Sequence, residues 1–461
     1  MDNKPQSLLA LEIDHDKCKG TLACMRVCPT QAIRVRDGKV SIHPRECIFC
    51  GTCIRACPEG AIRPRTDPWE SIQAFPFKIA IPSTSLFGQF PANVSPADIF
   101  DGLLAIGFDA VYDLSIESEL VRRAIQDYMD EYDGPLPLIS STCPVIVRLI
   151  QYFYPDMIGQ IVPIESPREL AAREVKRLYS EEKGIPPEDI GAIYITPCSA
   201  KMAAIKHPAE GVNSHLDLAI GIHQIYNPLL AAITHLQNEE EKRPRRGDRP
   251  RVLRSKLSLN MTLTGGVSHN IRQNRYITMS QLPNIIRVIE DIEKGKIRDV
   301  EFLECYSCTG GCIGGPLNVD NLFVARSKIE KLVREVEAAN HSVEREVERR
   351  YVKGDYFIRR SLAPRPDRKK LPDLREQIAQ IKMKERLLEI LPGIDCGLCG
   401  CPTCEVFAED VSTGKAKAGN CILVDDERIG ELRSLYAFDD SRLPRRKKEA
   451  EKKKEKETEE E

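Results

Sequence analysis

The most constraining feature of this chain is a tight run of cysteines near its start. Four cysteines and a proline follow in the order Cys47-x2-Cys50-x2-Cys53-x3-Cys57-Pro58. Three thiolates at this spacing hold three corners of an iron–sulfur cubane, and the fourth, turned away by the proline, ligates a neighbouring cluster. The run therefore predicts a [4Fe–4S] cluster rather than a zinc ion.

A related run precedes it, so residues 1–68 contain an internal repeat. This first run is Cys18-x5-Cys24-x3-Cys28-Pro29, with Thr21 where a further thiolate would be expected. Two such runs in succession predict a ferredoxin-like α+β domain with two clusters.

The missing thiolate has a consequence for one of the two clusters. In two-cluster ferredoxins the fourth cysteine of each run ligates the other cluster. One cluster therefore receives Cys47, Cys50, Cys53 and Cys28, and the other receives only Cys18, Cys24 and Cys57. We expect the second to be a [3Fe–4S] centre, or a [4Fe–4S] centre with a non-cysteine or solvent ligand. His15 is an alternative ligand that would make it an ordinary cluster.

From about residue 72 to 330, short apolar runs alternate with helical stretches. Examples are the runs 78–81 and 110–112 and the helix-like stretches 96–106 and 119–132. This alternation predicts an α/β domain with largely parallel strands.

Cysteines stand at three junctions where an expected strand ends. Two of them lie in Ser141-Thr142-Cys143-Pro144 and Thr196-Pro197-Cys198, where a Ser or Thr before a Pro is typical of a helix start. Free N–H groups there favour a thiolate. The third junction is Cys308-Thr309-Gly310-Gly311-Cys312. Strand ends of a parallel sheet meet at one edge, so we expect the four thiolates to converge. Buried structural cysteines or a zinc site are the alternatives.

A third group of cysteines lies near the end of the chain. Its members are Cys396, Cys399, Cys404 and, after sixteen further residues, Cys421. The spacing predicts a small Fe–S site, with zinc as the rival metal. Two cysteines remain unassigned. We expect Cys305 to be a packed thiol rather than a relay, and Cys401 to be a bystander.

Composition narrows the class of protein. The chain has 17 cysteines and no visible secretory signal, which favours metal or redox sites in a reducing compartment, with the cytoplasm as the expected location. The sequence contains no run of eighteen apolar residues, so we do not expect a transmembrane helix. A net charge of −2 gives no general case for nucleic-acid or membrane binding. The charged stretch 238–252 is expected to be a surface loop.

The chain divides into five expected segments. They are a two-cluster domain (1–68), an α/β domain (72–330), a charged helical connector (331–370), a four-cysteine Fe–S domain (371–436) and a charged low-complexity tail (437–461).

Taken together, these motifs resemble those of [FeFe]-hydrogenases over residues 1 to about 330. The three junctions are similar to the family motifs T-S-C-C-P, M-P-C-x-x-K and A-C-x-G-G-C-x-x-G-G-G. The segment 391–421 is similar to small Fe–S modules of Rnf-type electron-transport subunits and corrinoid Fe–S proteins. The resemblance implies the expected fold class: an α/β H-cluster domain between a ferredoxin-like domain and a small Fe–S domain.

The resemblance also implies a cofactor and its ligands. An H-cluster joins a [4Fe–4S] cluster to a diiron subsite bearing CO, cyanide and an azadithiolate. Lys201 matches the lysine that hydrogen-bonds a cyanide, and Pro82 and Ser83 match a pocket wall. Glu117 and Glu119 lie near the family's proton-path carboxylates, with an exposed helix start as the alternative. The cluster ligands implied by position are Cys143, Cys198, Cys308 and Cys312, with Cys312 bridging to the diiron subsite.

Several positions depart from the family pattern. Active members have a proton-relaying cysteine where this chain has Thr142, and a hydroxyl is far less acidic than a thiol. Two family methionines are replaced by Thr196 and Tyr306, and Pro316 shortens the third motif. These changes alter the soft, dry surroundings of the diiron subsite.

The resemblance implies a hydrogenase-like oxidoreductase that reversibly splits or forms H2. The departures favour low turnover, similar to the sensory-type members of the family. Expected partners are H2 and protons, a ferredoxin-like electron carrier or a redox or signalling protein, and hydrogenase maturation proteins. The alternative is a non-catalytic electron-transfer or Fe–S assembly-type protein without the diiron subsite.

Overall fold

The computed structural model describes residues 10–207, 213–239, 255–336, 341–358, 362–365 and 374–424. Nearly all of the 238–252 insertion and all of the 437–461 tail lie outside these ranges. The chain forms two compact units, one of Met1–Asp14 and Glu46–Pro366 and one of His15–Arg45 and Asp367–Glu461. Within the described ranges, none of the helices has both the length and the apolarity needed to cross a bilayer.

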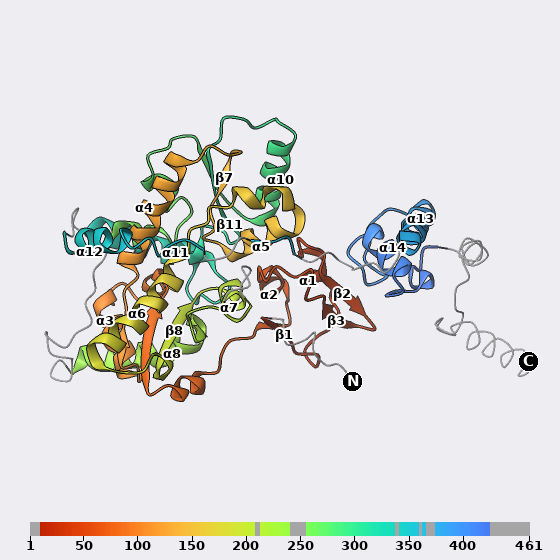
Figure 1. The fold of residues 1–461 in the computed structure, drawn as a ribbon. Coiled ribbons are helices and arrows are strands. Elements are labelled where there is room, and N and C mark those ends of the chain that lie inside the picture. Colours follow the sequence, from red (N-terminus) through yellow and green to blue (C-terminus); the bar gives the residue numbers. More distant parts are fainter. Residues whose placement is uncertain are drawn as a thin grey trace, which may run out of the picture. The chain divides into compact units, whose positions relative to one another are not determined.

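The larger unit contains a four-stranded parallel sheet in the order β6-β5-β8-β9. Its strand β8 is labelled in Figure 1. All seven residues of β8 are buried, as expected for a parallel strand covered on both faces. The strands are β5 (Phe77–Pro82), β6 (Ala110–Val111), β8 (Ile190–Thr196) and β9 (Leu218–Gly221).

A second parallel sheet, in the order β10-β11-β7, lies in the same unit. Its register places Phe302 opposite Leu138 and Tyr276. The two parallel sheets confirm the predicted α/β fold class. Their strands are β7 (Leu138–Ile139), β10 (Tyr276–Ser280) and β11 (Phe302–Tyr306).

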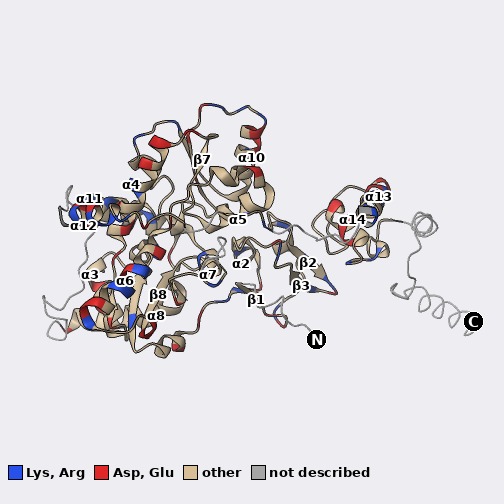
Figure 2. Ribbon diagram, in the orientation of Figure 1, with Lys and Arg blue, Asp and Glu red and all other residues tan. Residues whose placement is uncertain are grey.

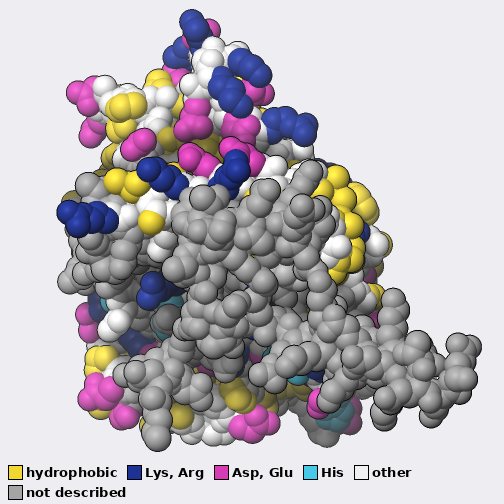
Figure 3. Space-filling view, turned by 90° about the vertical axis from the view of Figure 1, so that its right-hand side faces the viewer, with side chains coloured by type: hydrophobic (Ala, Val, Ile, Leu, Met, Phe, Trp, Pro, Cys, Tyr) yellow, Lys and Arg dark blue, Asp and Glu magenta, His cyan; other side chains and the backbone are white. Residues whose placement is uncertain are grey.

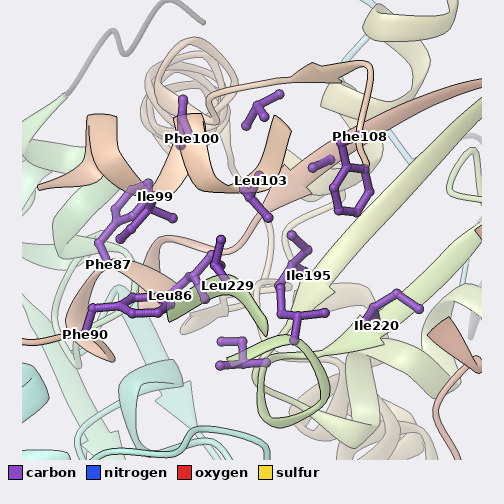
Figure 4. Close-up of a cluster of buried hydrophobic side chains, with 14 of the residues drawn as sticks. Leu86, Phe87, Phe90, Ile99, Phe100, Leu103, Phe108, Ile195, Ile220 and Leu229 are labelled. Carbon is purple, nitrogen blue, oxygen red and sulfur yellow. The ribbon is translucent and has the colours of Figure 1, made fainter. Parts of the chain in front are cut away.

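The main core packs one face of the four-stranded sheet against helices α3 (Pro96–Ala105) and α8 (Ile222–Asn238). Ile195 and Ile220 from the sheet meet Leu103 of α3 and Leu229 of α8 (Figure 4). Helix α3 begins where it does because Ser95 and Asp98 form a reciprocal capping box. On the opposite face, helix α6 (Pro167–Lys183) covers Ile79 and Ile81 with Ala171, Ala172 and Val175.

The helices of the larger unit carry most of its charge, whereas the sheet strands are largely uncharged (Figure 2). The α-helices are α2 (Thr52–Ala56), α3 (Pro96–Ala105), α4 (Ser115–Glu131), α5 (Pro144–Phe153), α6 (Pro167–Lys183), α7 (Ser199–Lys206), α8 (Ile222–Asn238), α9 (Lys256–Asn260), α10 (Leu282–Glu293), α11 (Leu322–Glu335) and α12 (His341–Tyr351). The 3₁₀ turns are η2 (Trp69–Ala74), η3 (Thr84–Gly88), η4 (Pro155–Gln160), η5 (Pro187–Asp189), η7 (Ser268–Asn270) and η8 (Cys312–Gly314).

The charged stretch expected to act as a connector packs onto the larger unit. At its start, Leu332, Val333 and Val336 pack against the main core, and α12 buries Val343 and Val347 in a second cluster with Phe302. Both signs of charge lie side by side on the described part of the surface in Figure 3.

The smaller unit combines an antiparallel hairpin with two helices from the far end of the chain. In the hairpin, Val35 of β2 pairs with Val40 of β3. Its elements are α1 (Ala23–Arg26), β2 (Ile33–Arg36), β3 (Lys39–Ile42), α13 (Leu374–Ile390), α14 (Cys404–Ser412) and the turn η9 (Ala418–Asn420). The strands β1 (Leu11–Ile13) and β4 (Ile62–Pro64) pair antiparallel in the larger unit.

The two N-terminal cysteine runs have the same local geometry. Each short helix is preceded by a residue in the left-handed backbone conformation, Leu22 in one run and Gly51 in the other. The amide of Ala32 donates to Cys28 Sγ at 3.3 Å, and the amide of Ala61 donates to Cys57 Sγ at the same distance. The predicted repeat is therefore visible in the backbone.

Candidate functional site

Three turns at the carboxyl ends of parallel strands carry the central cysteines. Cys143 follows β7 and is the N-cap of α5, and Cys198 follows β8 and is the N-cap of α7. Cys308 lies in the turn after β11, and Cys312 begins η8. The strand-end and helix-start positions predicted for these residues are observed.

The four sulfur atoms lie close enough together to interact electrostatically. Burial raises the pKa of Cys143 to about 11, and the Cys198 and Cys312 sulfurs contribute to that rise. Burial also raises the pKa of Cys308 well above its usual value, as do Cys198, Cys143 and Cys312. A thiolate here needs a cation to offset its desolvation, which bound iron would supply. In the described ranges, no three His, Cys, Asp or Glu side chains surround one point closely enough to share a single ion.

Two glycines allow the third turn to lie close to the Cys198 turn and to the segment that follows α9. Gly311 has a φ of 100°, and a Cβ there would lie 2.6 Å from the Thr262 carbonyl oxygen. A Cβ on Gly315 would lie 2.3 Å from the Pro197 carbonyl oxygen, beside Cys198. Only glycine fits both approaches.

Lys201 lies next to the sulfur predicted to bridge the two parts of the cofactor. It stands on α7, one turn after Cys198, and its Nζ donates to Cys312 Sγ at 3.3 Å. The side chain is 9% exposed. Burial lowers the pKa of Lys201, but Cys312 and Tyr194 raise it more, so the ammonium stays charged.

A cavity of about 50 Å³ opens beside Lys201 and Cys312. Ser83, Thr142 and Lys201, three of the four residues predicted to act there, line it, whereas Pro82 ends β5 and is not in its wall. Thr142 and Ser140 share a hydrogen bond of 2.9 Å between their hydroxyls.

Among the residues of the cavity wall that were not predicted, two have chemically distinctive side chains. Met261 supplies a thioether, and no sequence signal marked it. Arg168 supplies a guanidinium, and the Ser166-Pro167 pair before it is similar to the Ser/Thr and Pro helix-start pattern found around Cys143 and Cys198. That pattern could have drawn attention to a fourth turn at the site.

Glu117 is not at an exposed helix start, as one alternative supposed. It is 0% exposed, accepts a hydrogen bond of 2.8 Å from the Tyr112 hydroxyl and forms an ion pair with Arg350. Burial raises the pKa of Glu117 to about 7, although Arg350 and Tyr112 lower it. Glu119 accepts a hydrogen bond from Ser255.

The second cysteine run packs directly against this site within the larger unit. Ser199 Oγ, next to Cys198, donates to the Phe49 carbonyl at 3.0 Å. The guanidinium of Arg55 donates to the Gly314 carbonyl. A Cβ on Gly51 would lie 2.9 Å from Pro316 Cγ. The segment Cys47–Cys57 is thus adjacent to the turns that carry Cys198 and Cys312.

The C-terminal cysteines lie together in the smaller unit. Cys399, Cys404 and Cys421 belong to one apolar cluster with Leu387 and Phe407. Burial raises the pKa of Cys421, and the sulfurs of Cys399 and Cys404 contribute. Cys396, the first of the four predicted C-terminal ligands, directly precedes Gly397, which has a positive φ.

The loop that carries these cysteines packs on the β2–β3 hairpin. Val35 N donates to the Gly400 carbonyl at 2.9 Å, and a Cβ on Gly400 would lie 1.9 Å from the Val35 carbonyl oxygen. A Cβ on Gly397 would lie 2.9 Å from Met25 Cε, next to Cys24. Cys401, expected to be a bystander, is buried and its thiol donates to Asp410 at 3.4 Å.

Comparison with known families agrees with this arrangement. A model described as iron only hydrogenase large subunit, C-terminal domain, matches residues 78–316. A 4Fe-4S dicluster domain matches residues 10–58, and an Fe–S cluster model matches residues 391–423. Since the first model covers more than half of the chain, the protein belongs to the iron-only, or [FeFe], hydrogenase large-subunit family.

Individual relatives are distant. The NADP-reducing hydrogenase subunit HndD of Solidesulfovibrio fructosivorans is 24% identical over 244 residues, 45% of this chain and 42% of the relative. The periplasmic [Fe] hydrogenase large subunit of Nitratidesulfovibrio vulgaris is 27% identical over 216 residues, 43% and 51% of the two chains. The chain thus spans about half or less of these relatives. A solved variant of the [FeFe]-hydrogenase HydA1 from Chlamydomonas reinhardtii is 18% identical with a TM-score of 0.45, covering 65% of this chain and 94% of that one.

Proposed function

We propose that this protein is an oxidoreductase that reversibly splits and forms H2 at an H-cluster. The observation that carries the proposal is the buried Lys201 ammonium, 3.3 Å from Cys312 Sγ at the wall of a cavity. When bound, a diiron subsite with CO, cyanide and azadithiolate ligands would supply an open iron position and an amine base. The residues proposed to hold the cofactor are Cys143, Cys198, Cys308 and Cys312.

The donor set fits such a group. Four thiols interact in a buried site, which suits a [4Fe–4S] cluster. Lys201 is a charged donor at the cavity wall, and a charged donor offsets the desolvation of a buried anion such as cyanide. Ser83 adds a hydroxyl to the same wall.

Proton transfer in this chain would pass through hydroxyls. Thr142 lines the cavity in the place of a relay thiol and is hydrogen-bonded to Ser140. A hydroxyl releases a proton far less readily than a thiol of pKa roughly 8.5. We therefore propose low turnover and a role in sensing H2.

Electrons would enter or leave through the ferredoxin-like clusters. The run Cys47–Cys57 touches the turns of Cys198 and Cys312 through Ser199 and Arg55, so we propose its cluster as the relay to this site. We propose that the cluster held in part by Cys18, Cys24 and Cys57 lacks a fourth cysteine ligand. A ferredoxin-like carrier or a signalling protein would exchange the electrons, and maturation proteins would supply the diiron subsite.

The cysteine chemistry favours a reducing compartment. None of the cysteines in the described ranges forms a disulfide. Fe–S ligands must stay reduced to bind iron. We propose the cytoplasm as the location.

The hydroxyl-rich wall supports a second candidate, a non-catalytic electron-transfer or Fe–S assembly-type protein. Ser118, Thr142, Ser166, Ser258 and Thr262 all line the cavity, where a soft and dry pocket would suit a diiron subsite better. This candidate keeps the cubane at the four cysteines but holds no diiron unit.

Infrared spectroscopy separates the two candidates. Protein co-expressed with hydrogenase maturation proteins should show CO and cyanide stretching bands, and should exchange H2 with D2O slowly. A Lys201→Ala variant should lose or shift a cyanide band. Iron content matching four filled clusters, without any CO or cyanide band, would support the non-catalytic candidate instead.

A further inference from the structure

A buried arginine at the cavity has no partner among the described residues. Arg168 is the second residue of α6, is 9% exposed and lines the cavity beside Cys312. Its Nε is buried without a hydrogen-bond acceptor, and no carboxylate in the described part of the chain pairs with the side chain. Buried charges are normally paired, because an unpaired one is strongly destabilising.

The same small cavity holds a second cation. Lys201 and Arg168 both line it, and Lys201 already donates to Cys312 Sγ. Two cations that share one buried space repel each other unless an anion lies between them. A single thiolate hydrogen-bonded to Lys201 leaves Arg168 uncompensated.

Two hydroxyls at this wall also lack partners among the described residues. Ser166 Oγ and Thr262 Oγ1 are buried, line the cavity and have no hydrogen-bond partner within that part of the chain. Thr262 is only 2% exposed. Buried polar atoms without partners are rare in folded proteins, so three at one cavity indicate a ligand that accepts hydrogen bonds.

We propose that Arg168, assisted by Ser166 and Thr262, is a second cationic donor for the anionic ligands of the diiron subsite. Lys201 would bind one cyanide and Arg168 another. The inference rests on the proposed function, because the cyanides belong to the diiron subsite. A bound cyanide and a free small anion would be recognised by the same donors. A small anion in solution should therefore bind at Arg168 even when the diiron subsite is absent.

The first arm of the test uses protein with its [4Fe–4S] clusters but without the diiron subsite. Thermal midpoints are measured over a titration with sodium azide, at ionic strength held constant with sodium chloride. Wild-type protein should be stabilised by azide, and R168Q should bind it roughly tenfold or more weakly. Arg177→Gln is the control, since Arg177 lies on the same helix but already pairs with Glu174 and Glu181.

The second arm uses protein loaded with the diiron subsite. R168Q should shift one cyanide band, R168K should shift it less, and the other cyanide band should stay in place. Loaded R168Q with both cyanide bands unmoved would overturn the assignment of Arg168. Equal azide responses in wild-type and R168Q protein would overturn anion binding by Arg168. Wild-type protein without any cyanide band would reject the proposed function, while the azide arm still judges the anion site.

Discussion

Two buried arginines, one in each unit, differ in their surroundings. Arg34 in the smaller unit is 3% exposed and donates to both carboxylate oxygens of Asp410, at 2.7 and 3.2 Å. Arg168 in the larger unit is almost as buried, yet its Nε has no acceptor within the described residues. The paired Arg34 links two distant segments of the chain. The unpaired Arg168 lines a cavity and is suited to bind an anion there.

The Asp410 carboxylate is the centre of the paired arrangement. It also accepts hydrogen bonds from Arg36 at 2.7 Å and from the Cys401 thiol. Burial raises the pKa of Asp410, but Arg34 and Arg36 lower it more, so the carboxylate stays ionised. This ion pair joins the β2–β3 hairpin to α14, which carries Cys404.

The largest expected effect comes from breaking the paired arginine. Asp410→Asn leaves Arg34 buried and uncompensated, so it should lower the free energy of unfolding of the smaller unit by about 3–5 kcal/mol. Urea denaturation followed by loss of Fe–S absorbance measures it. Asp291→Asn, which breaks an exposed pair with Lys296, should cost less than about 1 kcal/mol. Equal midpoints for the two variants would show that the Arg34–Asp410 pair is not structural.

Glu117 is an intermediate case, a buried carboxylate that is paired but still costly to ionise. Burial raises the pKa of Glu117 to about 7, while an unfolded glutamate titrates near its usual value of roughly 4.3. As pH rises from about 4.5 to 7, the unfolded state loses its proton first, so stability falls and then levels off. Glu117→Gln should remove up to about 3 kcal/mol of this fall.

Urea midpoints of wild-type and E117Q protein at pH 5, 6 and 7.5 check the prediction for Glu117. Arg350 keeps Glu174 and Glu346 as partners in the variant. Parallel stability curves across this pH window would mean that Glu117 is ionised throughout.

Removing the unpaired arginine should stabilise the protein, whereas Asp410→Asn should destabilise it. In protein without the diiron subsite, Arg168→Gln removes an uncompensated charge and should raise the free energy of unfolding by about 1–3 kcal/mol. Thermal or urea denaturation at low salt measures the gain. A loss of stability as large as that of D410N would mean that the two arginines have the same structural role.

The smallest effect on stability is expected at Thr142, an uncharged residue of the cavity wall. Thr142→Cys should leave the unfolding midpoint nearly unchanged but raise H2 turnover roughly tenfold or more, because a thiol relays protons more readily. Thr142→Ser, which keeps a hydroxyl, is the control. Turnover that is equal in fully loaded T142C and wild-type protein would count against the relay argument.

Much of the site could be predicted because its signals are local. The turns around Cys143 and Cys198 follow from short apolar strands and helix-start residues within a few positions. The glycines of the third turn mark a close approach that only glycine allows. The ligand roles of the cysteines stay predictions, as do the five segment boundaries.

The burial and pairing of charged side chains could not be predicted from the sequence. Glu117 was compatible with an exposed helix start, and only the packing of α12 against α4 places Arg350 beside it. Cys401 was expected to be a bystander because it sits between ligand cysteines in the sequence. Its contact with Asp410, which pairs with Arg34 and Arg36 from a distant segment, appears only in the structure.

The sequence by itself therefore determined the cysteine-bearing turns, the parallel α/β class and the family, because spacing and helix-start chemistry act over a few residues. Only the tertiary structure decided which charges are buried and which of them are paired. Arg34 and Asp410 are 376 positions apart, and Arg168 reaches the cavity because α6 begins beside it. The cost of burying a charge depends on what surrounds it, and those surroundings come from distant parts of the chain.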